Sequence, residues 1–139
     1  GIVKNLSEDF EFSDGSHHLV LHSGDNGDGA LFTGILVRYL AQAAMSTMLS
    51  PEARSLASAL VYGSARAVWE GRREFDPTLP LNEPGIDPNE IRDRAIAIFS
   101  PKFTVSTRDA LAAGKPVELS GQLQAWMTLE AAARLSAED

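Results

Sequence analysis

The stretch that decides the fold reads Gly24-Asp25-Asn26-Gly27-Asp28-Gly29-Ala30-Leu31-Phe32-Thr33-Gly34-Ile35-Leu36-Val37-Arg38-Tyr39-Leu40-Ala41. It joins an acidic, glycine-rich loop directly to an apolar helix. Glycine tolerates positive φ, so the loop can bend freely. Its carboxylates and amides then lie at the N-terminus of the helix, where the first backbone N–H groups have no acceptors within the helix. We therefore expect the chemistry of this chain to gather near the loop.

The composition sets limits on the possible partners. The chain has 139 residues, the size of one domain or of a piece of a larger one, with 44% hydrophobic residues and a net charge of −7. Such an acidic chain lacks the basic face that nucleic acids and anionic membranes require, so neither is expected as a partner. The absence of cysteine excludes disulfides and thiolate metal sites. No apolar run reaches the roughly 18 residues of a membrane span.

The N-terminal residues 1–23 alternate between apolar and polar side chains on either side of a turn sequence. Phe10 and Phe12 alternate with polar residues before the turn, and Leu19 and Leu21 belong to the second run. The turn itself is Ser13-Asp14-Gly15-Ser16. Two alternating runs around Asp-Gly predict a β-hairpin.

The rest of the chain is predicted to be helical, so the fold class is mainly all-α. Apolar residues recur at helical spacing, with Asp28 and Ser50 as N-caps and Pro51 at a first helical position. Four prolines in residues 72–88 predict a long loop. The expected helices span residues 28–49, 51–70, 88–99 and 118–137. These few helices carry wide apolar faces, so we expect some faces to be left open or covered by another chain.

Three segments of the chain carry a family resemblance. They are Asp28-Gly29-Ala30-Leu31-Phe32-Thr33-Gly34-Ile35-Leu36-Val37-Arg38-Tyr39-Leu40-Ala41, Ser64-Ala65-Arg66-Ala67-Val68-Trp69 and Glu118-Leu119-Ser120-Gly121-Gln122-Leu123-Gln124-Ala125-Trp126-Met127-Thr128-Leu129-Glu130-Ala131-Ala132. In sequence and in order they resemble glycoside hydrolase family 76, the endo-α-1,6-mannanase-like enzymes. Together they cover most of residues 24–135. The main departure is Thr33, where many members carry Lys.

The resemblance implies an (α/α)6 barrel, an inner and an outer ring of about twelve helices, of which this chain would be the C-terminal portion. It also implies a retaining mechanism on α-1,6-linked mannan, without a cofactor, in an extracellular or cell-envelope protein. The family's two adjacent catalytic aspartates lie upstream of the matched region. Retention needs two carboxylates about 5–5.5 Å apart, and this chain has no Asp-Asp pair. Its adjacent acids, Glu8-Asp9 and Glu138-Asp139, are poor candidates, so no catalytic residue is assigned and no turnover is expected from the chain alone.

The candidate sugar-binding residues lie at the rim near residues 22–33, namely His22, Asp25, Asp28, Phe32 and Thr33. The ordinary interpretation makes Asp28 an N-cap and Asp25 a turn former. A calcium loop at Asp25-Asn26-Gly27-Asp28 lacks the downstream Glu of an EF-hand. A metal site on His17, His18 and His22 lacks a clear third ligand, so no metal is assigned.

The other aromatic and charged candidates are interpreted as structural. Tyr39, Trp69 and Trp126 fall at helical spacing and are expected in the core, although aromatic rings also suit the apolar faces of sugars. Arg38 is expected to be buried against a carboxylate such as that of Glu130. The alternative function is a non-catalytic helical module that binds carbohydrate or protein. Under the resemblance, the expected partner of the chain is a mannan-type oligosaccharide, and the remainder of the barrel or a second copy is a further candidate.

Overall fold

The computed structural model describes residues 6–24, 27–75, 96–111 and 117–138. This part is mainly helical, with a short antiparallel hairpin near the N-terminus, as the sequence predicts. The helices are α2 (Asp28–Ala44), α3 (Pro51–Glu70), α5 (Thr107–Ala110) and α6 (Leu119–Glu138), and the strands are β1 (Ser7–Glu11), β2 (His17–Leu21), β3 (Arg73–Phe75) and β4 (Ile96–Ile98).

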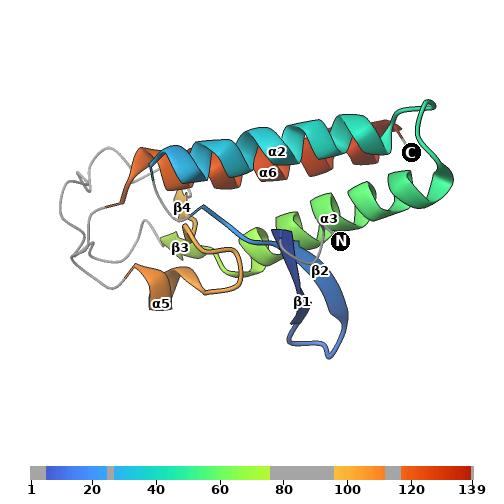
Figure 1. Cartoon of the computed structure of the whole chain (residues 1–139). Coiled ribbons are helices and arrows are strands. Elements are labelled where there is room, and N and C mark those ends of the chain that lie inside the picture. The colour runs from blue at the N-terminus through green and yellow to red at the C-terminus, as the bar shows by residue number, and fades with distance from the viewer. Residues whose placement is uncertain (1–5, 25–26, 76–95, 112–116, 139) are drawn as a thin grey trace.

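Helices α2 and α6 lie side by side and run in the same direction, while α3 returns in the opposite direction (Figure 1). Contacts at both ends of the bundle fix these directions. The Gly27 amide at the start of α2 donates to Ser120 Oγ at the start of α6, at 2.8 Å. At the far end of α6, Ser136 Oγ donates to the Tyr62 hydroxyl of α3 at 3.2 Å. Two parallel helices are thus joined through an antiparallel one.

The seam between α2 and α6 is built from small residues. Gly34 of α2 lies directly against Met127 of α6, and a Cβ at Gly34 would come within 2.8 Å of the Met127 sulfur. Ala30 and Ala125 are fully buried on the facing helices. Small side chains let two helices approach closely, so dispersion contacts accumulate along the seam.

Helix α2 is shorter than the sequence predicts. It ends at Ala44 with Met45 as its C-cap, rather than at residue 49. The Ser46 amide donates to the Ala43 carbonyl, which closes the last turn at 3.1 Å. The following helix begins as expected, because Ser50 Oγ accepts from the Ala53 amide at 3.2 Å and Pro51 occupies the first turn.

The hairpin of β1 and β2 packs on α3, and its turn is where the sequence predicts it. Gly15 has a φ of 83°, and its amide donates to the Phe12 carbonyl at 2.9 Å. This left-handed residue after a turn suits a three-residue hairpin loop. On the packed side, a Cβ at Gly63 of α3 would collide with the Leu19 carbonyl. The neighbouring Ser64 hydroxyl accepts from the Leu21 amide at 3.0 Å, in a fully buried position.

Arg66 of α3 fastens the hairpin turn to the helix. Its guanidinium donates to Asp14 Oδ2 at 2.8 Å and to Ser16 Oγ at 3.0 Å, and it lies 4.3 Å from the centre of the Phe12 ring. Hydrogen bonds from Ser16 and from Arg66 hold the pKa of Asp14 well below its usual range. Because these bonds favour the ionised carboxylate, the turn is tied to α3 through a charged contact.

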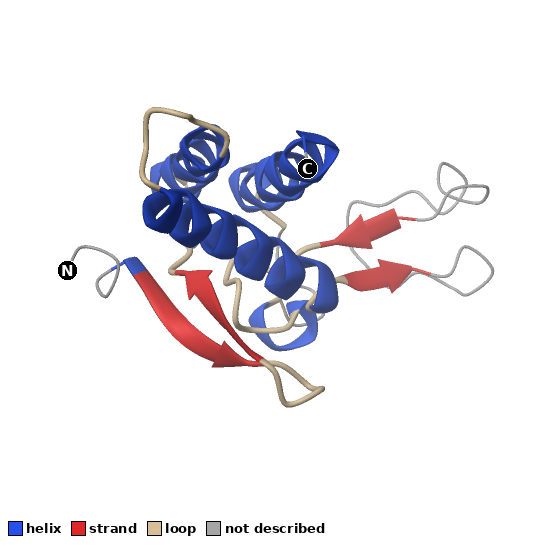
Figure 2. Ribbon diagram, turned by 90° about the vertical axis from the view of Figure 1, so that its right-hand side faces the viewer, coloured by secondary structure: helices blue, strands red, loops and turns tan. Residues whose placement is uncertain are grey.

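The sequence prediction of a helix over residues 88–99 is wrong for its described part. Residues 96–98 form strand β4, which pairs antiparallel with β3, with Arg73 opposite Ile98. Residues 88–95 lie outside the described residues. Strand β3 also occupies the start of the predicted loop over 72–88. Figure 2 shows this pair of strands well apart from the N-terminal hairpin.

The core of the described part lies between the hairpin and the long helices. It consists of Phe12, Val20, Leu21, Val37, Ala41, Leu60, Val61, Ala67, Val68, Phe103, Ala125, Ala131 and Leu135. The short helix α5 begins with Ser106 as its N-cap, whose hydroxyl accepts from the Asp109 amide at 3.3 Å. None of the described helices combines the length and the apolar character that crossing a bilayer demands.

Candidate functional site

The glycine-rich loop lies at the end of the bundle where α2 and α6 both begin. Its described residues are held against α6, because the Gly24 amide donates to Gln124 Oε1 at 3.0 Å and the Gly27 amide donates to Ser120 Oγ. A Cβ at Gly24 would collide with the Gly29 carbonyl, so the loop folds tightly back on itself. The positive ends of two helix dipoles therefore point to the same side of the molecule.

Two glutamines of α6 anchor the segments around this end. Gln124 is fully buried, and its Nε2 donates to the Pro101 carbonyl at 3.0 Å while its Oε1 holds Gly24. Gln122 binds both backbone groups of Phe99, accepting from the amide at 2.9 Å and donating to the carbonyl at 2.8 Å. Each amide side chain thus satisfies backbone groups that belong to no helix or strand. The site is consequently supported by α6.

The structure changes the role expected for Asp28. The N-cap of α2 is Gly27, with a φ of 69°, and no side chain caps this helix end. Asp28 is the first helical residue, and its exposed carboxylate favourably faces the positive end of the dipole. Asp25 lies outside the described residues.

The side chains of Phe32 and Thr33 lie on different sides of α2, although the two residues are neighbours in sequence. Phe32 is 69% exposed and follows Asp28 by four residues, so the two share one face of α2. Thr33 is buried, and its hydroxyl donates to the Gly29 carbonyl of its own helix at 3.1 Å. Thr33 therefore belongs to the packed face and is corrected from a rim residue to a core residue. His22 is exposed directly after β2, and its amide donates to the Leu6 carbonyl.

The aromatic residues expected in the core are instead on the surface. Tyr39 is 65% exposed, Trp126 is 66% exposed and Trp69 is 48% exposed. Trp69 carries the Arg72 guanidinium 3.7 Å above its ring. Small residues line the contact between α2 and α6, and Tyr39 and Trp126 lie on the outer sides of these two helices. Along α2, the small residues Ala30, Gly34 and Ala41 recur at helical spacing, and this spacing is the signal that could have revealed the orientation.

Large apolar side chains are exposed on both α2 and α6. Helix α2 exposes Leu31, Ile35 and Tyr39 beside Phe32, at the spacings of one helix face. Helix α6 exposes Leu119 and Trp126 seven residues apart, which also places them on one face. We call these residues the α2–α6 face; its members are Leu31, Phe32, Ile35, Tyr39, Leu119 and Trp126. This surface confirms the expectation that some apolar faces lack cover within the described part of the chain.

The expected buried ion pair between Arg38 and Glu130 does not form. Both side chains are exposed and line a small crevice of about 20 Å³, and the described residues hold no ion pair between them. Exposed partners gain little from pairing, because water competes for each charge. Arg38 is therefore corrected from a buried residue to a surface residue.

Of the two pairs of adjacent acids, Glu8 and Asp9 are placed where they cannot work together, and Asp139 of the other pair lies outside the described residues. Glu8 and Asp9 are exposed neighbours on β1, so their side chains point to opposite faces of the strand. Asp9 Oδ2 lies 3.0 Å from His17 Nδ1. His18 Nε2 lies 3.0 Å from an Arg66 nitrogen. Within residues 6–24, 27–75, 96–111 and 117–138, no three acidic or histidine side chains gather as metal ligands.

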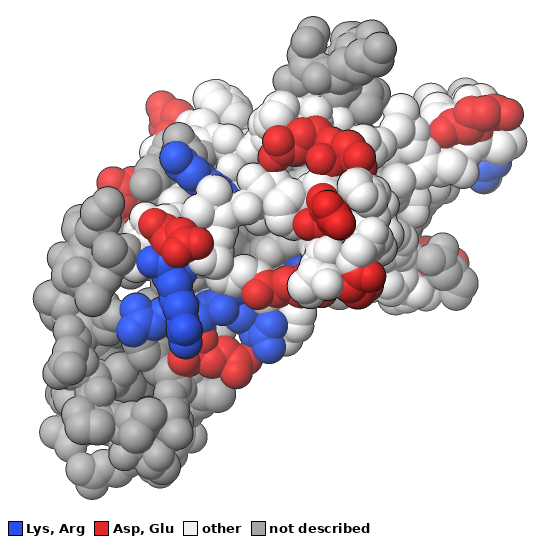
Figure 3. Space-filling view, turned by 90° about the horizontal axis from the view of Figure 1, so that it is seen from below, with Lys and Arg blue, Asp and Glu red and all other residues white. Residues whose placement is uncertain are grey.

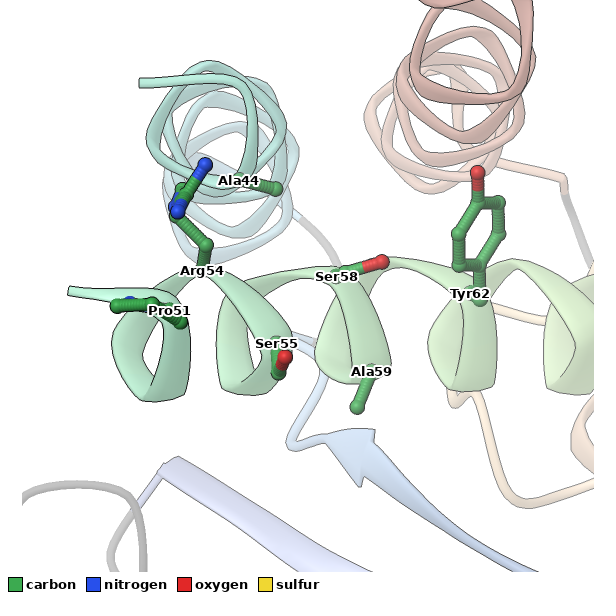
Figure 4. Close-up of a pocket in the computed structure, with 7 residues that line it drawn as sticks. All are labelled: Ala44, Pro51, Arg54, Ser55, Ser58, Ala59 and Tyr62. Atoms are coloured by element: carbon green, nitrogen blue, oxygen red, sulfur yellow. The ribbon is translucent and has the colours of Figure 1, made fainter. Parts of the chain in front are cut away.

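Another hollow of about 470 Å³ lies along α3, near the end of α2 (Figure 4). Arg54 points toward α2, and Tyr62 points toward α6. The buried Nε of Arg54 makes no hydrogen bond with the described residues. Small side chains make up most of the remaining lining, namely Ala44, Pro51, Ser55 and Ala59.

The charges on the surface are mixed. Figure 3 shows most of the basic side chains visible from below in one group, with acidic side chains around it. This side of the described surface presents no continuous basic groove of the kind that binds a nucleic-acid backbone. Comparisons of the chain with protein-family models, with curated proteins and with solved structures find no match.

Proposed function

We propose that this chain is the C-terminal part of an α/α-barrel glycosidase similar to glycoside hydrolase family 76, and that it supplies part of a sugar-binding rim. The observation that carries the proposal is the parallel pair of α2 and α6, joined through the antiparallel helix α3. In a double ring, each inner helix is followed by an outer helix that runs back. Successive inner helices must therefore be parallel neighbours, as α2 and α6 are.

The α2–α6 face supports the same proposal. In a complete ring, the exposed sides of inner helices line the lumen or contact the next helix pair. Phe32 and Asp28 lie at the shared N-terminal end, with an aromatic ring and a carboxylate one turn apart. A ring can stack on the apolar face of a pyranose, and a carboxylate can accept its hydroxyl protons. The substrate class proposed is an α-1,6-linked mannose oligosaccharide or polysaccharide.

The catalytic acid pair is proposed to belong to sequence upstream of Gly1. Retaining hydrolysis requires two carboxylates flanking the scissile bond, one ionised and one protonated. Asp28 alone can contact a sugar but cannot serve both roles. The chain is therefore expected to bind substrate weakly and to turn none over.

The test combines a binding measurement with an activity measurement. NMR titration with α-1,6-linked mannotetraose should shift the amide signals of residues 27–33, and Phe32→Ala should weaken binding about fivefold or more, the loss of one stacking contact. Met48→Ala is the matched control, because Met48 is 91% exposed and lies beyond the other end of α2. Release of reducing ends from α-1,6-mannan by this chain alone would contradict the proposal that the catalytic acid pair lies upstream.

The alternative is a non-catalytic module that binds carbohydrate or protein through the α2–α6 face. The exposure of the aromatic residues Trp126 and Tyr39 favours it, because exposed aromatic rings can bind sugars or proteins without catalysis. A polypeptide that includes the upstream coding sequence distinguishes the two. Mannan hydrolysis that disappears when an upstream aspartate is replaced supports the enzyme, and binding without hydrolysis supports the module.

A further inference from the structure

The hollow of about 470 Å³ along α3 has a basic lining, although the chain is acidic. Among the described residues that line it, Arg54 carries the charge, and the others are alanines, serines, a proline and Tyr62. The chain as a whole has a net charge of −7. A described lining that holds a cation and no carboxylate thus goes against the charge balance of the chain. A charged group that enters this hollow meets a positive charge first.

The guanidinium of Arg54 lacks an acceptor among the residues that the structure describes. Its Nε is buried and makes no hydrogen bond with them. Arg66 and Arg72 each bind a carboxylate, whereas Arg54 takes part in none of the described ion pairs. A guanidinium presents five donors in a planar fork, and a donor that is buried without an acceptor is costly. An oxyanion in the hollow would supply the acceptors that these donors lack.

Ser58 places a hydroxyl group near Arg54. The two residues are four apart on α3, so they are neighbours on one face of the helix, one turn from each other. Tyr62 follows one turn later, and its hydroxyl accepts from Ser136 Oγ of α6 at 3.2 Å (Figure 4). Guanidinium and hydroxyl groups are donors that suit the oxygens of carboxylates and phosphates. The lining therefore combines a charged donor with a neutral one.

Two helix ends meet at this hollow, and their dipoles act in opposite directions on a bound charge. Ala44 is the last residue of α2, whose C-terminus carries a partial negative charge. Pro51 is the first residue of α3, whose N-terminus carries a partial positive charge. Each end is equivalent to roughly half an elementary charge. Because these two contributions offset each other, the full charge of Arg54 decides which sign of ligand is attracted.

We propose that this hollow binds an oxyanion, the carboxylate or phosphate group of a small molecule. The Arg54 guanidinium is its main contact, and the Ser58 hydroxyl is a second donor. The volume lies in the usual range of small-molecule sites, so the body of the ligand extends along α3 toward Tyr62. This binding is independent of the sugar-binding rim, because the hollow adjoins the end of α2 opposite to Asp28 and Phe32.

The test titrates inorganic phosphate, acetate and acetamide separately into 15N-labelled protein at pH 7. Acetamide has the shape of acetate without its charge, and sodium chloride keeps the ionic strength constant, because salt screens surface charges. Phosphate and acetate are expected to shift the amide signals of residues 54–59 to saturation, and acetamide is expected to leave them in place. Tighter binding of phosphate than of acetate would support a phosphate group as the ligand, and the reverse order would support a carboxylate.

Two variants locate the binding. Arg54→Gln should weaken the binding of phosphate and acetate about tenfold or more, because it removes the charged donor. Ser58→Asp keeps Arg54 but places a carboxylate one turn away, which competes for the guanidinium and should weaken binding about two- to fivefold. This second variant keeps the test decisive if Arg54→Gln disturbs the fold. Arg38→Gln removes an exposed arginine from a separate crevice, so it is the matched control and should leave binding unchanged.

Other results would overturn the assignment of this hollow to an oxyanion. Equal shifts with acetate and with acetamide would remove the role of the charge. Shifts that sodium chloride alone reproduces would show general screening rather than a site. Binding that neither Arg54→Gln nor Ser58→Asp weakens would place the anion elsewhere on the protein. Unchanged signals of residues 54–59 at the end of both anion titrations would leave the Arg54 guanidinium to water.

Discussion

At the residue scale, the contact between α3 and the hairpin depends on the missing side chain of Gly63. Glycine in the middle of a helix costs about 1 kcal/mol relative to alanine, so its presence needs a packing reason. The reason here is the Leu19 carbonyl, which occupies the space a Cβ would need. Because a backbone atom cannot rotate away, the helix or the strand must shift to accommodate any larger residue.

We therefore predict that Gly63→Ala destabilises the protein by about 1–3 kcal/mol, the usual cost of overpacking, despite its better helix propensity. Urea denaturation would measure the change in the free energy of unfolding. Ser55→Ala, on the exposed side of the same helix, isolates the propensity effect and should be neutral or slightly stabilising. A stabilised Gly63→Ala variant would show that α3 and β2 are farther apart than described.

Asp14 makes the stability contributed by the hairpin turn dependent on pH. Its folded-state pKa lies below the ordinary value of about 3.9, because Ser16 and Arg66 donate to its carboxylate. A depressed pKa contributes stability that is complete above the ordinary value and is lost as the pH falls toward the folded-state value. The contribution of Asp14 should therefore disappear progressively below about pH 4.

The variant Asp14→Asn is expected to have a lower urea midpoint of unfolding at pH 7 than the original protein. Its midpoint should also decrease less between about pH 4 and pH 2. Asparagine before glycine keeps a good turn sequence, so the substitution removes the charge and spares the turn. Denaturation curves at several pH values would measure the difference. Parallel pH profiles for the two proteins would exclude Asp14 as a source of acid sensitivity.

At the scale of elements, α6 organises the end of the bundle through Gln124. This side chain is fully buried and bridges Gly24 to Pro101, so it joins the glycine-rich loop to the segment before α5. No periodic pattern in the sequence distinguishes such a glutamine from one at the surface. Its role becomes visible only when its two backbone partners are placed beside it.

We predict that Gln124→Ala costs about 1–3 kcal/mol for each backbone group left unsatisfied. Hydrogen exchange at the Gly24 amide should also accelerate, because this amide loses its acceptor. The matched control is Gln42→Ala, an exposed glutamine of α2 that should change stability by less than about 0.5 kcal/mol. Unchanged protection of Gly24 in Gln124→Ala would show that another group holds the loop.

The elements predicted correctly are those whose signals are local. Asp14-Gly15 fixes the hairpin turn, and Ser50-Pro51 fixes the start of α3. Strand β4 was predicted as helix, because Ile98 and its neighbours fit a helical spacing while their partner, β3, lies more than twenty residues earlier in the sequence. Pairing between distant short strands leaves no periodic mark in either segment.

The exposure of the candidate site residues could be predicted only in part from the sequence, because it also depends on contacts between distant elements. Phe32 and Asp28 do reach the surface at the mouth of α2, but Thr33 turns to the core. Tyr39 and Trp126 were assigned to the core because large apolar residues at helical spacing usually pack inside. Which face of a helix is buried depends on the neighbouring helix. Here the contact between Gly34 and Met127 buries the side of α2 that carries small residues.

At the scale of the whole molecule, the α2–α6 face sets the described part of the chain apart from a self-contained bundle. A chain that fills its own core seldom exposes aromatic residues at repeated helical spacing on two adjacent helices. Arg38 and Glu130, which are also exposed on these two helices, line a separate crevice of about 20 Å³. Whatever covers this surface must itself be mostly apolar.

In the absence of any other polypeptide, we predict that the chain covers this surface by associating with itself. Sedimentation velocity should show a weight-average mass that rises with protein concentration. The double variant Phe32→Glu with Trp126→Glu should remain monomeric, because it places charge within the apolar contact. Both side chains are about two-thirds exposed, so the variant should unfold at nearly the same urea concentration as the original protein. Met48→Glu, the same kind of change outside the face, should not alter association. A wild-type chain that stays monomeric at high concentration would show that this apolar surface is stable in water, and that neither a second copy nor the remainder of a helical ring is needed to cover it.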